Sequence, residues 1–226
     1  MFSRFAIYYT PEPDSDLAKF GASWLGWDSV AGRQVAHPTV ASIDIEALTR
    51  TPRKYGFHAT IKPPLRLAAG KTADELAGHL EALCATAKPV QLDGLAVTRL
   101  GKFLALCPVG DTGPLAYLAA RFVKELDAFR AAPNEAELAK RRAARLTAAQ
   151  EALLLEWGYP YVLDEFRFHM TLSGRLDAEL ADRAEAALAE QLAHVSLAPH
   201  DIATMTLLGE AADGKFHQIH RYALTG

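Results

Sequence analysis

The chain has 226 residues, of which 50% are hydrophobic and 23% are charged, with a formal net charge of −3. This composition excludes a disordered protein, and the chain is long enough to bury one large core or two smaller ones. The slightly acidic balance, with a pI near 6.2, argues against a protein that coats long nucleic acid. It is compatible with a small phosphorylated ligand in a local basic pocket.

Hydrophobic periodicity and turn signals predict the same series of elements in both halves of the chain. The first half is expected to contain a strand at 4–10, a helix at 14–27, a short helix at 43–49, a strand at 55–62 ended by Pro63-Pro64, a helix at 72–87, and strands at 90–99 and 102–109. The second half is expected to contain helices at 113–130 and 135–157, a strand at 165–173, a helix at 177–193, and strands near 195–208 and 215–224. Each half thus has a strand, then a helix, then a pair of strands.

Two segments in the strands at 55–62 and 165–173 are nearly identical. Phe57-His58-Ala59-Thr60-Ile61 and Phe168-His169-Met170-Thr171-Leu172 both read Phe-His-x-Thr-aliphatic. They lie about half a chain length apart, which indicates two related halves that each contribute one histidine and one threonine to a shared site. A single copy of so short a motif would be weak evidence, but the repeat is strong evidence.

Both motif strands are predicted to have one apolar face and one polar face, because side chains alternate along a strand. The residues expected on the polar faces are His58, Thr60 and Lys62 in the first strand, and Arg167, His169, Thr171 and Ser173 in the second. Tyr8, on the polar face of the opening strand, is a further candidate to line the same cleft.

Two facing imidazoles suit displacement at phosphorus. A neutral imidazole takes a proton from water, while a protonated one gives a proton to the leaving oxygen, and an unperturbed pKa near 6.5 makes both forms accessible. The hydroxyls of Thr60 and Thr171 are placed to donate to the phosphoryl oxygens as negative charge develops there. This scheme requires no metal or cofactor. The sequence alone does not decide which histidine is the base.

Other interpretations of these residues remain open. His58 and His169 also fit a pair of core histidines, or a zinc site, although no carboxylate or thiolate lies at ligand spacing around either motif. Lys62 and Arg167 fit either a phosphate contact or a solvated strand end. The basic run at 140–145 fits a solvated helix face, or a surface that steers an anion toward the cleft.

Longer strings around both motifs resemble a known superfamily. Tyr55-Gly56-Phe57-His58-Ala59-Thr60-Ile61-Lys62-Pro63-Pro64, the stretch 165–174, and Gln150-Glu151-Ala152-Leu153-Leu154-Leu155-Glu156-Trp157-Gly158-Tyr159-Pro160-Tyr161 are similar to the 2H phosphoesterases. They most resemble an uncharacterised branch whose genes accompany bacterial phosphonate-utilisation operons. The resemblance extends over essentially the whole chain.

This resemblance implies an α+β fold with two pseudo-symmetric lobes, each an antiparallel sheet with helices on its outer face, around a cleft lined by both motifs. A single bilobed domain over 1–226 is expected, with lobe halves of roughly 1–110 and 111–226. The implied activity is metal-independent hydrolysis of a small cyclic phosphate, with His58, Thr60, His169 and Thr171 as catalytic residues. Alternatives are RNA 2′-5′ phosphoesterase or ligase chemistry, and a non-catalytic module that binds a phosphorylated ligand.

The cellular location is expected to be the cytoplasm. No stretch approaches the roughly 20 apolar residues needed to cross a bilayer, and the N-terminal segment lacks the pattern of a secretory signal. Cys84 and Cys107 are expected to be buried free thiols.

Overall fold

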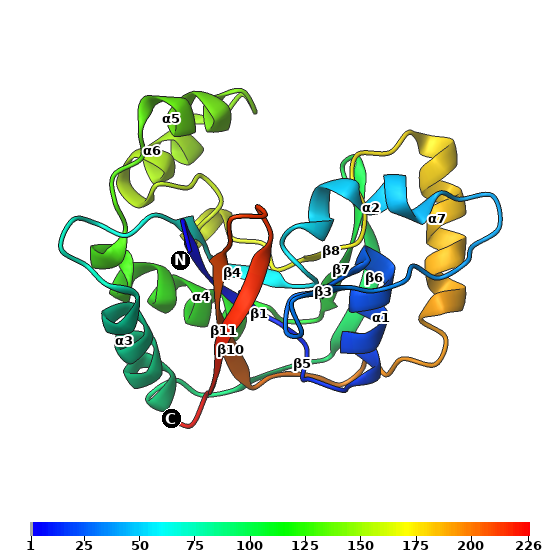
Figure 1. Ribbon diagram of the computed structural model, residues 1–226, viewed down its shortest axis with the longest axis horizontal. Helices are drawn as coiled ribbons and strands as arrows, with labels where there is room; N and C mark the ends of the chain where they lie inside the picture. The colour runs from blue at the N-terminus through cyan, green and yellow to red at the C-terminus, as the bar shows by residue number, and fades with distance from the viewer. Residues whose placement is uncertain (1) are drawn as a thin grey trace.

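The structure, a computed structural model, describes residues 2–226 and consists of helices packed around a large antiparallel sheet (Figure 1). The helices are α1 (Asp16–Leu25), α2 (Ile45–Arg53), α3 (Ala73–Ala85), α4 (Gly113–Glu125), α5 (Glu135–Arg142), α6 (Ala148–Trp157) and α7 (Ala178–Gln191). The strands are β1 (Phe5–Tyr9), β2 (Trp27–Asp28), β3 (Arg33–Gln34), β4 (Ala59–Leu65), β5 (Val90–Leu92), β6 (Gly94–Leu100), β7 (Phe103–Val109), β8 (Met170–Thr171), β9 (His200–Ile202), β10 (Thr204–Glu210) and β11 (Phe216–Ala223).

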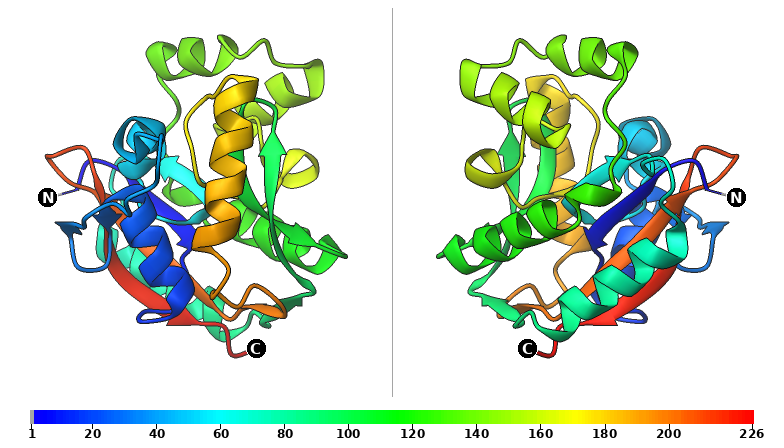
Figure 2. Two further views of the ribbon diagram at one scale, coloured as in Figure 1. Left: turned by 90° about the vertical axis from the view of Figure 1, so that its right-hand side faces the viewer. Right: turned by 90° about the vertical axis from the view of Figure 1, so that its left-hand side faces the viewer.

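The main sheet has seven strands in the order β11-β10-β1-β4-β8-β7-β6. It consists of a four-stranded group and a three-stranded group that meet where β4 pairs with β8, in antiparallel register at Ala59 and Met170. The two views in Figure 2 show how strongly the sheet turns between the groups. The α+β class expected from the sequence is confirmed.

The two strand groups are built by exchange between the halves of the chain. The strand pair that follows the first motif, β6 and β7, joins the second motif strand β8, while β10 and β11 join β1 and β4. Corresponding strands β5 and β9 also pair with each other. The expected division into lobe halves at about residue 110 is therefore wrong, because each lobe takes strands from both sides of that point.

Helices cover the two groups separately. Helix α3 packs on β10 and β11, while α7 packs on β6 and β7, and α4 lies against β4. Their apolar faces close one continuous core that includes Trp24, Leu80, Phe122 and Leu188. Within residues 2–226, no helix combines the length and the apolar character needed to cross a membrane.

Several elements end elsewhere than the sequence pattern predicted. The helix expected at 135–157 is two helices, since Arg145 adopts a positive φ of 55° and Thr147 begins α6 with a capping box to Gln150. The strand expected at 165–173 is reduced to Met170–Thr171, preceded by a 3₁₀ turn at Leu163–Glu165.

Strand β4 continues through Pro63-Pro64, where the sequence predicted its end. Two register shifts interrupt its pairing with β1, so that Tyr8 lies opposite Thr60 whereas Ile7 lies opposite Lys62. A bulge of this kind places an extra residue in one strand and changes the face to which the next side chains point. Lys62 consequently shares a face with the core residue Ile7 instead of continuing the polar row of His58 and Thr60.

The side chain of Lys62 is buried, with only 2% of its surface exposed. Its ammonium group donates hydrogen bonds to the carbonyl of Val123 and to the carboxylate of Asp127, at 2.8 and 3.1 Å. Burial lowers the pKa of Lys62 to about 8, and the nearby Asp127 carboxylate opposes that shift. Arg130 also pairs with Asp127. The role of Lys62 is therefore to attach α4 and the turn after it to β4.

We expect Gly21→Ala to destabilise the protein, because a Cβ at this position of α1 would overlap the ring of Phe57 beside His58. Overpacking of this kind costs about 1–3 kcal/mol. Gly78 in α3 is the matched control, since a Cβ there meets nothing within 4 Å. Gly78→Ala is expected to stabilise by about 0.5–1 kcal/mol through helix propensity. Urea denaturation of both variants tests this, and similar effects at the two sites would contradict the packing.

Lys62→Met is expected to lower the free energy of unfolding by about 1.5–3 kcal/mol, the range for hydrogen bonds to a charged group. The exposed Lys88→Met is the control and should change it by less than about 0.5 kcal/mol. Chemical denaturation measures both. An unchanged stability of Lys62→Met would show that the buried ammonium is not needed to hold α4 on β4.

Candidate active site

The two motifs meet at the junction of the strand groups. Because β4 and β8 are antiparallel with Ala59 opposite Met170, continuing the register places His58 opposite Thr171 and Thr60 opposite His169. Side chains one residue either side of a paired position point to the same face of a sheet. The antiparallel pairing therefore brings both histidines and both threonines to one face.

The two imidazoles are oriented by the same local contact. Nδ1 of His58 lies 2.9 Å from the carbonyl oxygen of Gly56, and Nδ1 of His169 lies 2.8 Å from that of Arg167. A carbonyl oxygen only accepts, so each Nδ1 carries a proton. In the neutral form of either ring, Nε2 is then the free basic atom, and in the charged form it is a donor. The Thr60 hydroxyl lies 3.3 Å from Nε2 of His58.

The bend before the first motif depends on Gly56. This residue has a φ of 74°, which residues with a side chain rarely adopt. A Cβ there would also come within 2.8 Å of the side chain of Ser29. The bend turns the Gly56 carbonyl toward His58, where it accepts the hydrogen bond that orients the ring.

The surroundings of the two histidines differ. The ring of Tyr8 stacks on His58 with centroids 3.8 Å apart and planes 22° from parallel. Burial lowers the pKa of His58 to about 4, partly opposed by its hydrogen bond to Gly56 and assisted by the nearby His169. Burial also raises the pKa of Tyr8 well above its ordinary value, so that the phenol stays neutral. His169 lies beside Phe103, with 5.8 Å between the ring centroids and the planes tilted by 55°.

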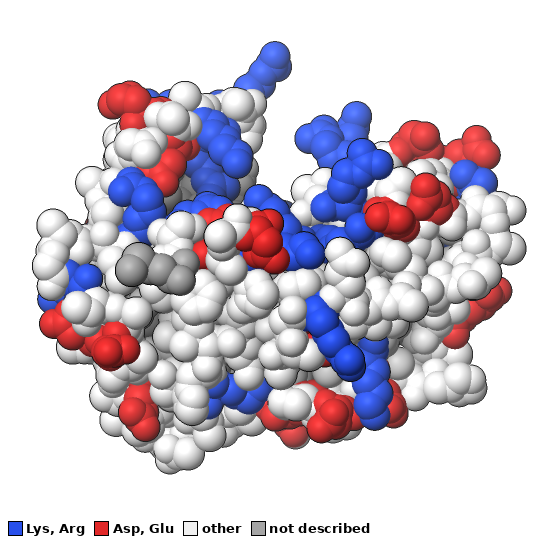
Figure 3. Space-filling view, viewed as in Figure 1, with Lys and Arg blue, Asp and Glu red and all other residues white. Residues whose placement is uncertain are grey.

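Two adjoining cavities open along this face. The smaller, of about 260 Å³, lies between the end of α2 and helix α5 and is lined by His58, Thr60 and Thr171, among others. The larger, of about 710 Å³, is lined by His169 and by several aromatic side chains. Thr60, Pro63 and Tyr159 line both, so the two form one cleft. Figure 3 shows the surface hollowed between the α5–α6 pair and α2, with Lys and Arg on both sides.

The remaining candidates from the sequence fall into different places. Tyr8 lines the smaller cavity, and the exposed Arg167 lines the larger one beside His169. Ser173 also borders the smaller cavity. Its hydroxyl accepts a hydrogen bond from the Leu104 N–H and donates one to the Gly174 carbonyl, so its proton is already used within the protein. Lys62 is directed into the core and lies outside the cleft lining, so the expectation that it contacts a substrate phosphate or ends the strand in solvent is wrong.

Some cleft residues were not singled out from the sequence. Tyr159 lies at the centre of the cleft lining, and the guanidinium of Arg141 lies 4.5 Å from the centre of its ring. Tyr55 borders His58, with 6.0 Å between ring centroids. Arg141 did stand in the basic run at 140–145, but nothing local distinguished its direction from that of Arg142, which pairs instead with Glu151.

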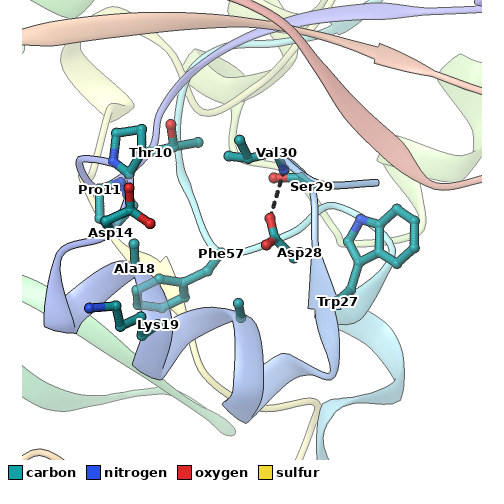
Figure 4. A pocket seen from close by; sticks show the side chains of 12 residues that line it. Thr10, Pro11, Asp14, Ala18, Lys19, Trp27, Asp28, Ser29, Val30 and Phe57 are labelled. Carbon is teal, nitrogen blue, oxygen red and sulfur yellow. Dashed lines mark hydrogen bonds between the residues drawn. The ribbon is translucent and has the colours of Figure 1, made fainter. Parts of the chain in front are cut away.

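A further cavity lies behind the first motif, on the far side of Phe57 (Figure 4). It is enclosed by the start of α1 and the turn at 28–30, and the Asp28 carboxylate there accepts hydrogen bonds from the N–H groups of Val30 and Ala31. Its lining contains neither motif histidine nor either motif threonine, so it lacks the chemistry of the cleft. Across residues 2–226, no three His, Cys, Asp or Glu side chains cluster in a way that would hold a metal ion.

Comparisons with known proteins give matches by sequence and matches by structure. The chain is 40% identical over 219 residues to a protein of Janthinobacterium sp. (strain Marseille) named ribose 1,5-bisphosphate phosphokinase PhnN, a match that covers 94% of this chain and 48% of that protein. The chain thus spans about half the length of this curated relative. Similar solved structures include a phosphoesterase (14% identical, TM-score 0.47) and E. coli LigT complexed with 3'-AMP (14% identical, TM-score 0.46), each covered over the full length of both chains.

A family model described as "Protein of unknown function (DUF1045)" matches residues 60–217. That range includes Thr60, the whole second motif, and the strand β7 with which β8 pairs. Because the match covers more than half of the chain, the protein belongs to the DUF1045 family.

Proposed function

We propose that the protein is a metal-independent phosphodiesterase that hydrolyses a small cyclic phosphate by general acid–base catalysis with two histidines. One observation carries this proposal. His58 and His169 both have Nδ1 held by the carbonyl two residues earlier, and the β4–β8 register puts their two rings and two threonines on one face. A pair of Nε2 atoms free to exchange protons suits in-line displacement at phosphorus.

The reaction adds water across one P–O bond. Nε2 of the base histidine takes a proton from the attacking water, and the oxygen forms a new bond to phosphorus. The bond from phosphorus to one ring oxygen breaks, and Nε2 of the acid histidine gives that oxygen its proton. Thr60 and Thr171 donate to the two non-bridging oxygens as charge develops on them. The long contact between Thr60 and His58 leaves the hydroxyl free to turn toward the substrate.

We assign His58 as the base and His169 as the acid. His58 is covered by Tyr8, and burial disfavours its charged form, so it is neutral and ready to accept a proton. His169 lines the larger cavity beside Arg167 and, in this proposal, gives its Nε2 proton to the leaving oxygen. The two motifs are equivalent, but their surroundings differ, and the proposal therefore gives one histidine the role of base and the other the role of acid. Active sites commonly obtain an acid and a base from one residue type in this way.

The substrate is proposed to be a sugar phosphate linked to phosphonate metabolism. The Janthinobacterium relative is named for a kinase that acts on ribose 1,5-bisphosphate. Hydrolysis of a cyclic phosphate on ribose leaves a ribose phosphate, which belongs to the same class of compound. A cavity of about 260 Å³ beside His58 is also of a size for a sugar phosphate.

The larger cavity favours a second candidate, an RNA end with a 2′,3′-cyclic phosphate or a 2′-5′ bond. Phe103, Tyr161 and Phe166 line it beside His169, and aromatic rings of this kind stack on nucleobases. An RNA substrate would make many phosphate contacts, so its binding should weaken steeply with salt, whereas a small cyclic phosphate should show little salt dependence.

Turnover of nucleoside 2′,3′-cyclic phosphates and ribose 1,2-cyclic phosphate in excess EDTA tests the proposed activity. We expect turnover that survives chelation and falls at least about 100-fold in His58→Ala and His169→Ala, since each proton transfer contributes about 10²–10⁴ in rate. Far-UV circular dichroism should show both variants folded. Near-normal rates in either variant would refute the two-histidine mechanism, and ligand-induced stabilisation without turnover would favour a binding module.

The pH dependence of kcat/KM tests the assignment of the base. His58 acts unprotonated, and its pKa of about 4 means that activity should persist as the pH falls and be halved only near pH 4. Tyr8→Leu, which removes the stacked phenol, is expected to move this acid limb upward toward 6.5, whereas the exposed Tyr117→Leu should not. A wild-type acid limb already near 6.5 would contradict the assignment.

A further inference from the structure

Positive charge gathers where α5 passes the cleft. The cavity beside His58 adjoins a second one under α5, and the cations that line these two cavities are Arg4, Arg66, Arg130, Lys140 and Arg141. Arg4, Lys140 and Arg141 line both cavities. This concentration exceeds what one monoanionic diester needs, because the diester at the motifs is already contacted by an imidazolium and two hydroxyls.

Three of these five cations pair with carboxylates of the protein. Arg4 makes two hydrogen bonds of 2.6 Å to Glu210. The guanidinium of Arg66 pairs with Glu137 at 2.9 Å. This ion pair also attaches α5 to the residue that follows β4.

Arg130 is the third paired cation, and it lies 2.8 Å from Asp127, a carboxylate that it shares with the buried Lys62. In the part of the chain that the structure describes, residues 2–226, neither Lys140 nor Arg141 forms an ion pair. Their neighbour Arg142 does, at 2.6 Å from Glu151 of helix α6. The two cations of this wall that lack a carboxylate partner both line the cleft beside His58.

Arg141 is held in place by an aromatic ring. Its guanidinium lies 4.5 Å from the ring centre of Tyr159, a cation–π contact that limits the freedom of a long side chain. A guanidinium whose face rests on a ring keeps the N–H groups at its edge available, and these suit phosphate oxygens in a bidentate arrangement. Tyr159 lines both cavities of the cleft, so this contact places Arg141 along the path of a bound substrate.

We propose that Lys140 and Arg141 bind a second phosphate of the substrate, so that the substrate is a cyclic phosphodiester that also carries a phosphomonoester. This inference rests on the proposed function and names the substrate class more narrowly. A phosphomonoester carries nearly two negative charges at neutral pH, which matches the two unpaired cations. The substituent extends from the phosphoryl centre at His58 along the wall of α5.

The test compares ribose 1,2-cyclic phosphate with and without a 5-phosphate as substrates. In Lys140→Gln/Arg141→Gln, kcat/KM for the 5-phosphorylated compound is expected to fall about 10–100-fold or more, as loss of charge-assisted hydrogen bonds predicts, mainly through KM. For the compound without the 5-phosphate the change should stay within about 3-fold. Arg142→Gln, on the same helix but paired with Glu151, is the matched control and should leave both substrates unchanged.

Equal losses on both substrates, or an equal loss in Arg142→Gln, would overturn the second phosphate site. If the wild type turns over neither compound, the proposed function is overturned instead. In that case, calorimetric titrations with ribose 1,5-bisphosphate and with ribose 1-phosphate test whether Lys140 and Arg141 bind a second phosphate. A preference for the bisphosphate of about 10-fold or more that the double variant loses would support the site, and equal affinities would overturn it.

Discussion

The antiparallel pairing of Ala59 with Met170 is the constraint on which the rest of the structure depends. It joins the four-stranded and three-stranded groups into one sheet, and it brings the histidine of each motif opposite the threonine of the other. Because side chains alternate with period two, a slip of one residue in one strand would turn its histidine and threonine to the opposite face. The exchange of strand pairs between the halves makes such a slip costly, since every neighbouring register would have to move with it.

The two motifs are equivalent in backbone and unequal in surroundings. Each histidine donates Nδ1–H to the carbonyl two residues earlier, so local sequence orients both rings. Tyr8 comes from β1 and covers only His58, whereas His169 borders the wider part of the cleft. Burial under the Tyr8 ring penalises the charged imidazole of His58 and lowers its pKa. The proposed division into base and acid therefore depends on β1, which carries no part of either motif.

Much of the fold could be predicted because many elements have local signals. Thr72 and Glu75 form a capping box at the start of α3, near the start of the helix expected at 72–87, and Gly101 occupies the turn between β6 and β7 with a positive φ of 61°. The errors have physical causes outside those signals. A strand such as β8 is only as long as its partners allow, and its pairing extends to Ala105 and Leu106 of β7 and to Ala59 of β4. The strand exchange between lobes has no local signature at all.

The sequence by itself determined which groups do the proposed chemistry. Side chains alternate along an extended chain, so the histidine and threonine of each His-x-Thr motif point to the same face wherever that strand lies in the sheet. It also determined an α+β protein with a strand, a helix and a strand pair in each half. Only the tertiary structure decided that Lys62 turns into the core, because the bulge in β4 arises from its pairing with β1. Only the structure separated Arg141, over Tyr159, from Arg142, beside Glu151. The direction of a side chain on a helix follows from what the helix packs against, and those partners are distant in the chain.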